Sequence, residues 1–240
     1  MKSGLTYIIF VIDRSGSMEK IRNDMIGGFN AFIETQRKVP GECRVFGYKF
    51  DTKYEPMFEN LDIKDVPTLD RNSFVPRGNT ALYDSLGKTI VDMGKRLAST
   101  PEEYRPEKVL VVSITDGEDN NHLEGEYTRY DASSVKSMVA HQTQVYKWDF
   151  AYLGANQNAW AVGGSMGVAQ AASLNYSPDS HGVAVAFAGL DDSVRSYRTS
   201  AKGTKFAFSG ASRSNEPDDA DAAVATTTTT TTTTKNKKKT

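Results

Sequence analysis

An α/β fold, with a doubly wound and mostly parallel central sheet flanked by helices, is predicted by two features of the sequence. Apolar runs of strand length alternate with segments whose apolar residues recur every three or four positions, the pattern of strands joined by crossover helices. Two of the runs, at 5–12 and 109–115, are almost wholly apolar, as expected for central strands covered on both faces. Each is followed directly by an aspartate, Asp13 or Asp116.

The first half of the chain predicts a strand, a helix and a hairpin. The helix that follows the first strand is marked by apolar residues at spacings of three and four, namely Met18, Ile21, Met25, Phe29, Phe32 and Ile33. It is expected to end before Pro40 and Gly41. The segments 43–50 and 54–61 flank a tight turn, so we expect them to pair as a hairpin at one edge of the sheet.

The second half continues the alternation of helices and strands. Helices are predicted at 82–97, 131–144, 156–162 and 183–197, and strands at 109–115, 148–153 and 173–176. Crossovers between parallel strands of one sheet are right-handed, so successive helices cover the sheet from either face. The pattern therefore predicts a single large α/β unit.

Composition divides the chain into one domain at 1–200 and a low-complexity tail at 201–240. Within the tail, 202–208 can form a short arm, and 209–225 is rich in Ser, Asp and Ala. An unbroken threonine run at 226–234 and a lysine-rich end follow. Such sequences bury too little apolar surface to offset the entropy cost of ordering, so the tail is expected to be disordered.

Charge and cysteine content exclude several classes of function. A net charge of -1 over 240 residues gives no global field to attract nucleic acid or an anionic membrane. No stretch is long enough to span a bilayer. Cys43 is the single cysteine, which excludes an intramolecular disulfide and a cysteine-based zinc site. We expect a soluble, cytoplasmic protein with no specific nucleic-acid partner, and the oligomeric state stays open.

The junction after the first strand carries a candidate metal-binding motif. Asp13 is followed by Ser15 and Ser17 around Gly16, so a carboxylate and two hydroxyls are placed at the mouth of the next helix. Oxygen donors of this kind suit Mg²⁺ or Mn²⁺. Taken alone, the motif has an equally good interpretation as a helix cap.

Two further segments are expected at the same edge of the sheet. Ligands of open parallel sheets bind beyond the carboxyl ends of the strands, where the winding direction reverses, and both Asp13 and Asp116 arrive there. Thr80 follows a flexible Gly78-Asn79 pair at the start of its own helix and can add another hydroxyl. The next acidic residues, Glu118 and Asp119, form either an auxiliary cation site or a solvated acidic loop at a helix entry.

The three segments together resemble the metal-ion-dependent adhesion site of the von Willebrand factor type A (vWA) domain family. The resemblance spans about 5–200 and implies a Rossmann-like, six-stranded sheet with one Mg²⁺ or Mn²⁺ at its upper edge. It implies that Ser15, Ser17 and Thr80 supply hydroxyl ligands, while Asp13 and Asp116 bind directly or through water. It also implies that an Asp or Glu of a partner protein fills the last coordination position.

Local stretches further resemble free-standing members of bacteria and tailed bacteriophages, among them 50–55, 75–84, 105–109 and 153–157. The function expected from the sequence is therefore a non-enzymatic, Mg²⁺-dependent protein-binding module. One alternative is a metal-dependent phosphoryl-transfer or hydrolytic enzyme, although the motif residues include no base, nucleophile or phosphate-binding lysine. The other is a structural or virion-associated protein.

Overall fold

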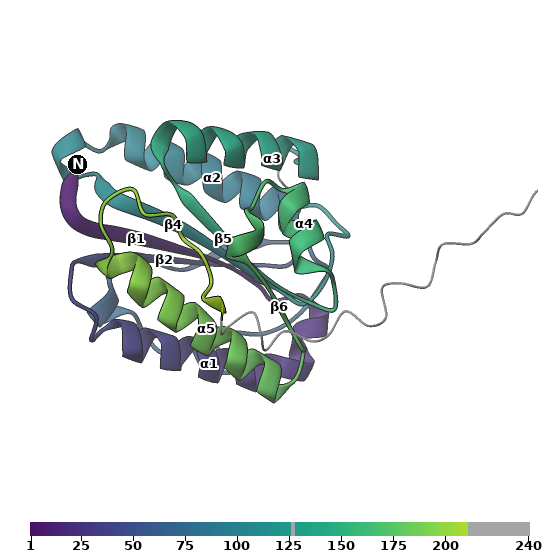
Figure 1. Cartoon of the computed structure of the whole chain (residues 1–240). Coiled ribbons are helices and arrows are strands. Elements are labelled where there is room, and N and C mark those ends of the chain that lie inside the picture. Colours follow the sequence, from purple (N-terminus) through teal and green to yellow (C-terminus); the bar gives the residue numbers. More distant parts are fainter. Residues whose placement is uncertain (126–127, 211–240) are drawn as a thin grey trace, which may run out of the picture.

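A computed structural model describes residues 1–125 and 128–210 as a six-stranded sheet covered by helices on both faces (Figure 1). The strands are β1 (Lys2–Asp13), β2 (Cys43–Phe50), β3 (Tyr54–Asp62), β4 (Pro106–Thr115), β5 (Asp149–Ala155) and β6 (Ser173–Tyr176). The helices are α1 (Arg22–Gln36), α2 (Leu82–Ser99), α3 (Ala132–His141), α4 (Ala159–Ser165) and α5 (Ser180–Thr199). The predicted fold class is confirmed.

The sheet order is β3-β2-β1-β4-β5-β6, so the chain begins near the middle of the sheet. It builds outward to β2 and β3, and then crosses back to β4 on the other side of β1. All neighbouring pairs are parallel except β2 with β3, which form the expected antiparallel hairpin at the edge. The winding direction therefore reverses between β1 and β4, where residue pairs such as Ile12 and Ile114 lie side by side.

The apolar core lies on both faces of β1 and β4. Residues 8–12 are at most 1% exposed, which explains why this strand reads as a continuous apolar run instead of an alternating one. In Figure 1, α2 and α3 lie on one face of the sheet, and α1 and α5 lie side by side on the other. The α1–α5 contact includes a buried hydrogen bond of 2.8 Å from Gln36 Nε2 to Asp191 Oδ1.

Two local features differ from the sequence pattern. A 3₁₀ turn, Gly16–Ile21, precedes α1, so the regular helix begins later than the first apolar residues of its stripe. Helix α3 passes into a π-helical turn, Gln142–Tyr146, which ends at Lys147 with φ +61°. These turns satisfy helix-end backbone groups that an apolar periodicity does not encode.

Packing of the chain continues past α5. Phe206 and Phe208 are 4% and 2% exposed, and their rings meet edge to face at 5.2 Å. The backbone N–H of Phe208 also donates to Ala171 O. These two aromatic residues therefore belong to the core, although composition predicts a domain boundary at 200. The expected poly-threonine and lysine-rich tail lies outside the described residues. No helix among the described residues is both long enough and apolar enough to cross a bilayer.

Two adjacent glycines of α1 are expected to respond in opposite ways to alanine. A Cβ at Gly28 would overlap the Phe187 ring of α5, whereas a Cβ at Gly27 meets nothing within 4 Å. We expect Gly28→Ala to lower the free energy of unfolding by about 1–3 kcal/mol through overpacking. Gly27→Ala should raise it by up to about 1 kcal/mol, because alanine favours the helix. Urea unfolding of the two variants measures both effects, and equal values would contradict the described α1–α5 packing.

Candidate metal centre

The reversal of winding places two aspartates at one point of the sheet edge. Asp13 is the last residue of β1, and Asp116 follows the last residue of the neighbouring strand β4. Both carboxylates are buried, with Asp13 at 0% and Asp116 at 4% exposure. Buried carboxylates are costly unless they are paired, hydrogen-bonded or bound to a metal, so this pair marks a candidate site.

Asp13 is held by donors on both of its carboxylate oxygens. Its Oδ2 accepts a hydrogen bond of 2.6 Å from Thr115 Oγ1, and its Oδ1 accepts one of 2.6 Å from the backbone N–H of Ser15. Burial nevertheless raises the pKa of Asp13 to about 7, and the charge of nearby Asp116 adds to the rise against these hydrogen bonds. Burial also raises the pKa of Asp116. A bound cation would relieve the same electrostatic cost that raises both pKa values.

The two serines of the motif connect the aspartates. Ser17 Oγ donates a hydrogen bond of 2.7 Å to Asp116 Oδ1, and the hydroxyls of Ser15 and Ser17 lie 3.1 Å apart. Ser15 is buried, whereas Ser17 is exposed. The hydroxyls therefore run from the buried floor of the site toward solvent.

The Thr80 loop packs against both of the other segments. The backbone N–H of Gly16 donates to Gly78 O at 3.1 Å, and Gly78 takes the left-handed φ of +65° that this approach requires. Thr80 N donates to Asn120 Oδ1 at 2.9 Å, and a Cβ built on Gly117 would lie 3.8 Å from Thr80 Oγ1. Thr80 is 3% exposed. The structure thus brings the segments that carry all five predicted site residues together.

The donor set fits a hard divalent cation. Two carboxylates and three hydroxyls offer oxygen atoms only, which is the chemistry that Mg²⁺ and Mn²⁺ prefer. Within 1–125 and 128–210, no cluster of three or more His, Cys, Asp or Glu side chains is arranged to hold a metal. Any cation at this edge would therefore depend on the hydroxyls of Ser15, Ser17 and Thr80.

The acidic residues after Asp116 serve the loop in which they lie. Asp119 Oδ1 accepts a hydrogen bond of 3.0 Å from the backbone N–H of Tyr83 and so caps the start of α2. Glu118 is exposed. Further along, His122 Nδ1 lies 3.0 Å from the buried carboxylate of Asp84, which also accepts from two backbone N–H groups. Of the two interpretations of Glu118 and Asp119, the structure supports the helix entry for Asp119.

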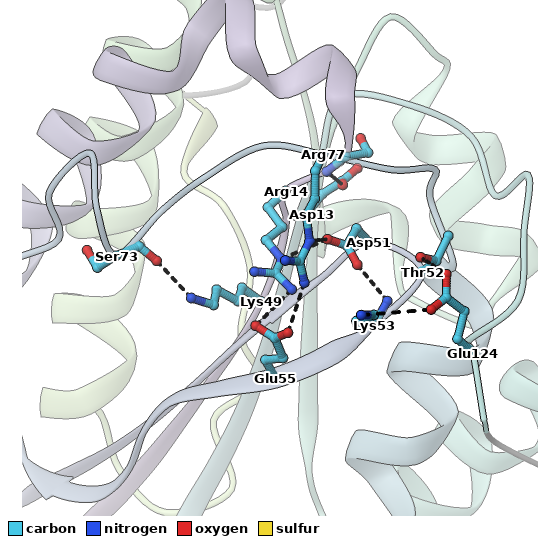
Figure 2. Close-up of polar contacts among 11 residues, drawn as sticks. Asp13, Arg14, Lys49, Asp51, Thr52, Lys53, Glu55, Ser73, Arg77 and Glu124 are labelled. Carbon is cyan, nitrogen blue, oxygen red and sulfur yellow. Dashed lines mark hydrogen bonds and ion pairs between the residues drawn. The ribbon is translucent and has the colours of Figure 1, made fainter.

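Sequence reasoning missed the residues that surround the site. The sequence pattern predicts Thr115 only as the last residue of a strand, although its hydroxyl donates to Asp13. Arg14, which lies between Asp13 and Ser15 in the motif, is 2% exposed and pairs with Asp51 at 3.0 Å. Figure 2 shows this pair next to Asp13, together with Glu55 and Arg77 from other segments. Only the polar residue at the end of an apolar strand, Thr115, offered a local signal.

Comparison with solved structures shows what the fold is. The vWF domain of the type V pili tip protein Mfa5 from Porphyromonas gingivalis matches with a TM-score of 0.57 at 12% identity, over 83% of this chain and 98% of that one. A von Willebrand factor type A protein from Catenulispora acidiphila matches with a TM-score of 0.51 at 13% identity, over 79% of this chain and 42% of that one. The chain has a vWA fold.

A third similar structure is that of a mussel protein. Proximal thread matrix protein 1 from the mussel byssus matches with a TM-score of 0.56 at 15% identity, over 80% of this chain. The chain spans only 46% of that protein, or about half of its length. Another structure of the same mussel protein, with a TM-score of 0.53, has zinc in its MIDAS motif, the metal-ion-dependent adhesion site. No protein-family model matches the sequence, and no curated protein is similar to it in sequence.

The buried charge of Asp13 predicts a pH dependence of stability in the metal-free protein. The pKa of Asp13 is raised to about 7 in the folded state, so its ionisation is easier in the unfolded chain. The stability conferred by this group is therefore present below about pH 4 and is lost as the pH rises to about 7. Asp13→Asn removes the charge, and the Thr115 hydroxyl can turn to donate to Gly117 O, 3.0 Å away.

We expect Asp13→Asn to raise the free energy of unfolding in EDTA at pH 8 by about 2 kcal/mol, because each unit of pKa shift corresponds to about 1.4 kcal/mol and some hydrogen bonding is lost. Urea unfolding at pH 5 and pH 8 is the measurement. Asp192→Asn, at an aspartate whose side chain is 70% exposed, is the control and should change neither value. An Asp13→Asn variant that is less stable than the parent at pH 8 would contradict the assigned cost of the charge.

Proposed function

We propose that this protein is a divalent-cation-dependent protein-binding module. In this proposal Asp13, Ser15, Ser17, Thr80 and Asp116 hold Mg²⁺ or Mn²⁺, and the cation recruits an acidic side chain of a partner protein. The observation that carries the proposal is the gathering of two buried aspartates and the hydroxyl-bearing segments where the winding of the sheet reverses. The vWA fold of the chain and the zinc-occupied motif of a similar structure support it.

Each residue of the site has a distinct role in the proposal. Thr115 and the backbone of Ser15 orient the Asp13 carboxylate, while the hydroxyls of Ser15, Ser17 and Thr80 complete the oxygen donors. A cation held by these residues would supply a Lewis-acidic centre for an incoming carboxylate. Because Ser17 is the exposed member of the set and Asp13 is the most deeply buried, the partner approaches from the Ser17 side.

The composition of the site favours Mg²⁺ or Mn²⁺ over zinc as the resident cation. Zinc sites in proteins are built mainly from Cys and His, whereas these five side chains carry only oxygen donors.

The residues next to the site favour binding over catalysis. The histidine of the adjacent loop, His122, is paired with Asp84, and Asp119 caps α2, so these groups already have structural roles.

Thr80 tests the ligand set directly. Thr80→Val keeps the shape of the side chain but removes its hydroxyl, whereas Thr80→Ser keeps the hydroxyl. We expect Thr80→Val to raise the Kd for Mg²⁺ by roughly tenfold or more, equal to about 1.4 kcal/mol, and Thr80→Ser to stay within about threefold of the parent. Isothermal titration with MgCl₂ is the measurement. Equal affinity for all three proteins would remove Thr80 from the ligand set.

Partner binding is tested by capture from a lysate of the native host with the tagged protein in MgCl₂ or in EDTA. We expect a partner that is retained with Mg²⁺, released by EDTA and restored by MnCl₂, because chelation removes the bridge to its carboxylate. The Thr80→Val variant should capture less of this partner than the parent protein does, whereas Thr80→Ser should capture as much as the parent. Substituting the partner's Asp and Glu residues by Asn and Gln then identifies the bridging carboxylate. If neither EDTA nor Thr80→Val changes the amount of partner captured, the proposed metal bridge would be contradicted.

A further inference from the structure

A closed ring of four ion pairs lies next to the proposed metal residues (Figure 2). Arg14 Nε lies 3.0 Å from Asp51 Oδ2, and Arg14 Nη2 lies 2.9 Å from Glu55 Oε2. Arg77 completes the ring, with its Nε 2.8 Å from the same Asp51 oxygen and its Nη2 2.9 Å from Glu55 Oε1. Each arginine therefore bridges the same two carboxylates with two of its nitrogens.

The ring joins segments that are far apart in the sequence. Arg14 stands between Asp13 and Ser15 in the first segment of the site, and Arg77 lies three residues before Thr80. The two carboxylates of the ring belong to the β2–β3 hairpin, whose turn begins directly after β2. The hairpin thereby connects the Asp13–Ser17 motif to the loop that carries Thr80.

The same hairpin turn also holds the third segment of the site. Thr52 Oγ1 donates to Glu124 Oε1 at 2.8 Å, and the backbone N–H of Glu124 donates to Thr52 O at 2.8 Å. Glu124 belongs to the loop that follows Asp116, and Figure 2 shows it reaching the turn from the side opposite the arginines. The turn of an edge hairpin thus contacts all three segments that carry the proposed ligands.

The members of the ring differ in burial. The side chains of Arg14 and Asp51 are 3% and 1% exposed, whereas those of Arg77 and Glu55 are 47% and 39% exposed. Removing either buried member would leave an uncompensated buried charge and would destabilise the whole domain. Arg77 is therefore the member whose loss perturbs the Thr80 loop while leaving the fold in place.

We propose that Arg77 is a positioning residue that fixes Thr80 and so sets the affinity of the site for its cation. The inference rests on the proposed function. The planar guanidinium of Arg77 bridges two carboxylates at once, which a lysine ammonium cannot do with the same geometry. Its backbone N–H also donates to Arg14 O at 2.8 Å, and a Cβ built on the next residue, Gly78, would lie 3.5 Å from Asp51 Cβ. The start of the loop is thus held to the hairpin and to the motif.

The alternative is that Arg77 affects the cation through its charge alone. This alternative predicts the opposite change in Mg²⁺ affinity when Arg77 is replaced. A positive charge near a cation site repels the cation, so removing that charge would strengthen Mg²⁺ binding. Loss of positioning would weaken it, because residues that orient metal ligands typically contribute about 10–100-fold to affinity. Arg77→Met removes the charge and the bridge, whereas Arg77→Lys keeps the charge and loses the bridge.

The experiment is isothermal titration of the full chain with MgCl₂, together with the melting temperature of each protein in EDTA. The control is Arg195→Met on α5, because Arg195 is 49% exposed and pairs with Asp191 at 2.8 Å. We expect the Kd for Mg²⁺ to rise about tenfold in both Arg77 variants and to stay unchanged in Arg195→Met. The melting temperature in EDTA should differ little between Arg77→Lys and the control.

A double variant shows whether Arg77 acts through Thr80. In a Thr80→Val background, Arg77→Lys should cause no further loss of Mg²⁺ affinity, because the hydroxyl that it positions is gone. Equal or tighter Mg²⁺ binding by both Arg77 variants, or a full additional loss in the double variant, would overturn the inference and leave the proposed function intact. A parent protein that binds no Mg²⁺ would overturn the proposed function and this inference together.

Discussion

The burial of the Asp13 carboxylate where the sheet reverses its winding is the constraint on which the rest of the site depends. The side chain has no exposed surface, and its two oxygens are held by Thr115 and by the backbone of Ser15. These hydrogen bonds do not offset the cost of desolvation, since the pKa stands at about 7. The ionised Asp13 carboxylate therefore lowers the stability of the folded chain. Functional sites commonly carry a cost in stability of this kind.

The architecture explains why the charge can be placed there. Strands β1 and β4 are neighbours in space but lie on either side of the reversal, so their carboxyl ends diverge into different loops. Beyond them, the backbone of the Asp13–Ser17 motif and the backbone of the Thr80 loop are joined by hydrogen bonds between Gly16 and Gly78 and between Arg77 and Arg14. The β2–β3 hairpin is separated from β4 by β1. Its turn nevertheless contacts all three segments that carry the proposed ligands, through Arg14, Arg77 and Glu124. The edge of the sheet thus supports the centre of the site.

The sequence predicts the fold because it is encoded locally, and it predicts the five candidate ligands because three short segments together resemble a known motif. Apolar periodicity marks the strands and helices, and Asp13, Ser15 and Ser17 stand at a fixed spacing after a strand. The ring of Arg14, Asp51, Glu55 and Arg77 has no such signal, because long side chains from three segments meet only after the sheet has formed. The burial of Phe206 and Phe208 could not be predicted from the sequence for a related reason. Two aromatic residues in a short polar stretch do not reveal their contacts, which are a ring contact of Phe206 with Tyr197 of α5 and a backbone hydrogen bond from Phe208 to Ala171 O.

Crystals of the full chain grown with MnCl₂, measured at a wavelength where manganese scatters anomalously, would show whether the five side chains hold a divalent cation. We expect one strong anomalous peak at the ends of β1 and β4, with the hydroxyl oxygens of Ser15, Ser17 and Thr80 at coordination distance, about 2.1 Å for a hard cation of this size. The aspartates should lie within coordination distance or one water away. An anomalous peak only elsewhere in the molecule, or none at this edge at saturating MnCl₂, would contradict the proposed cation site.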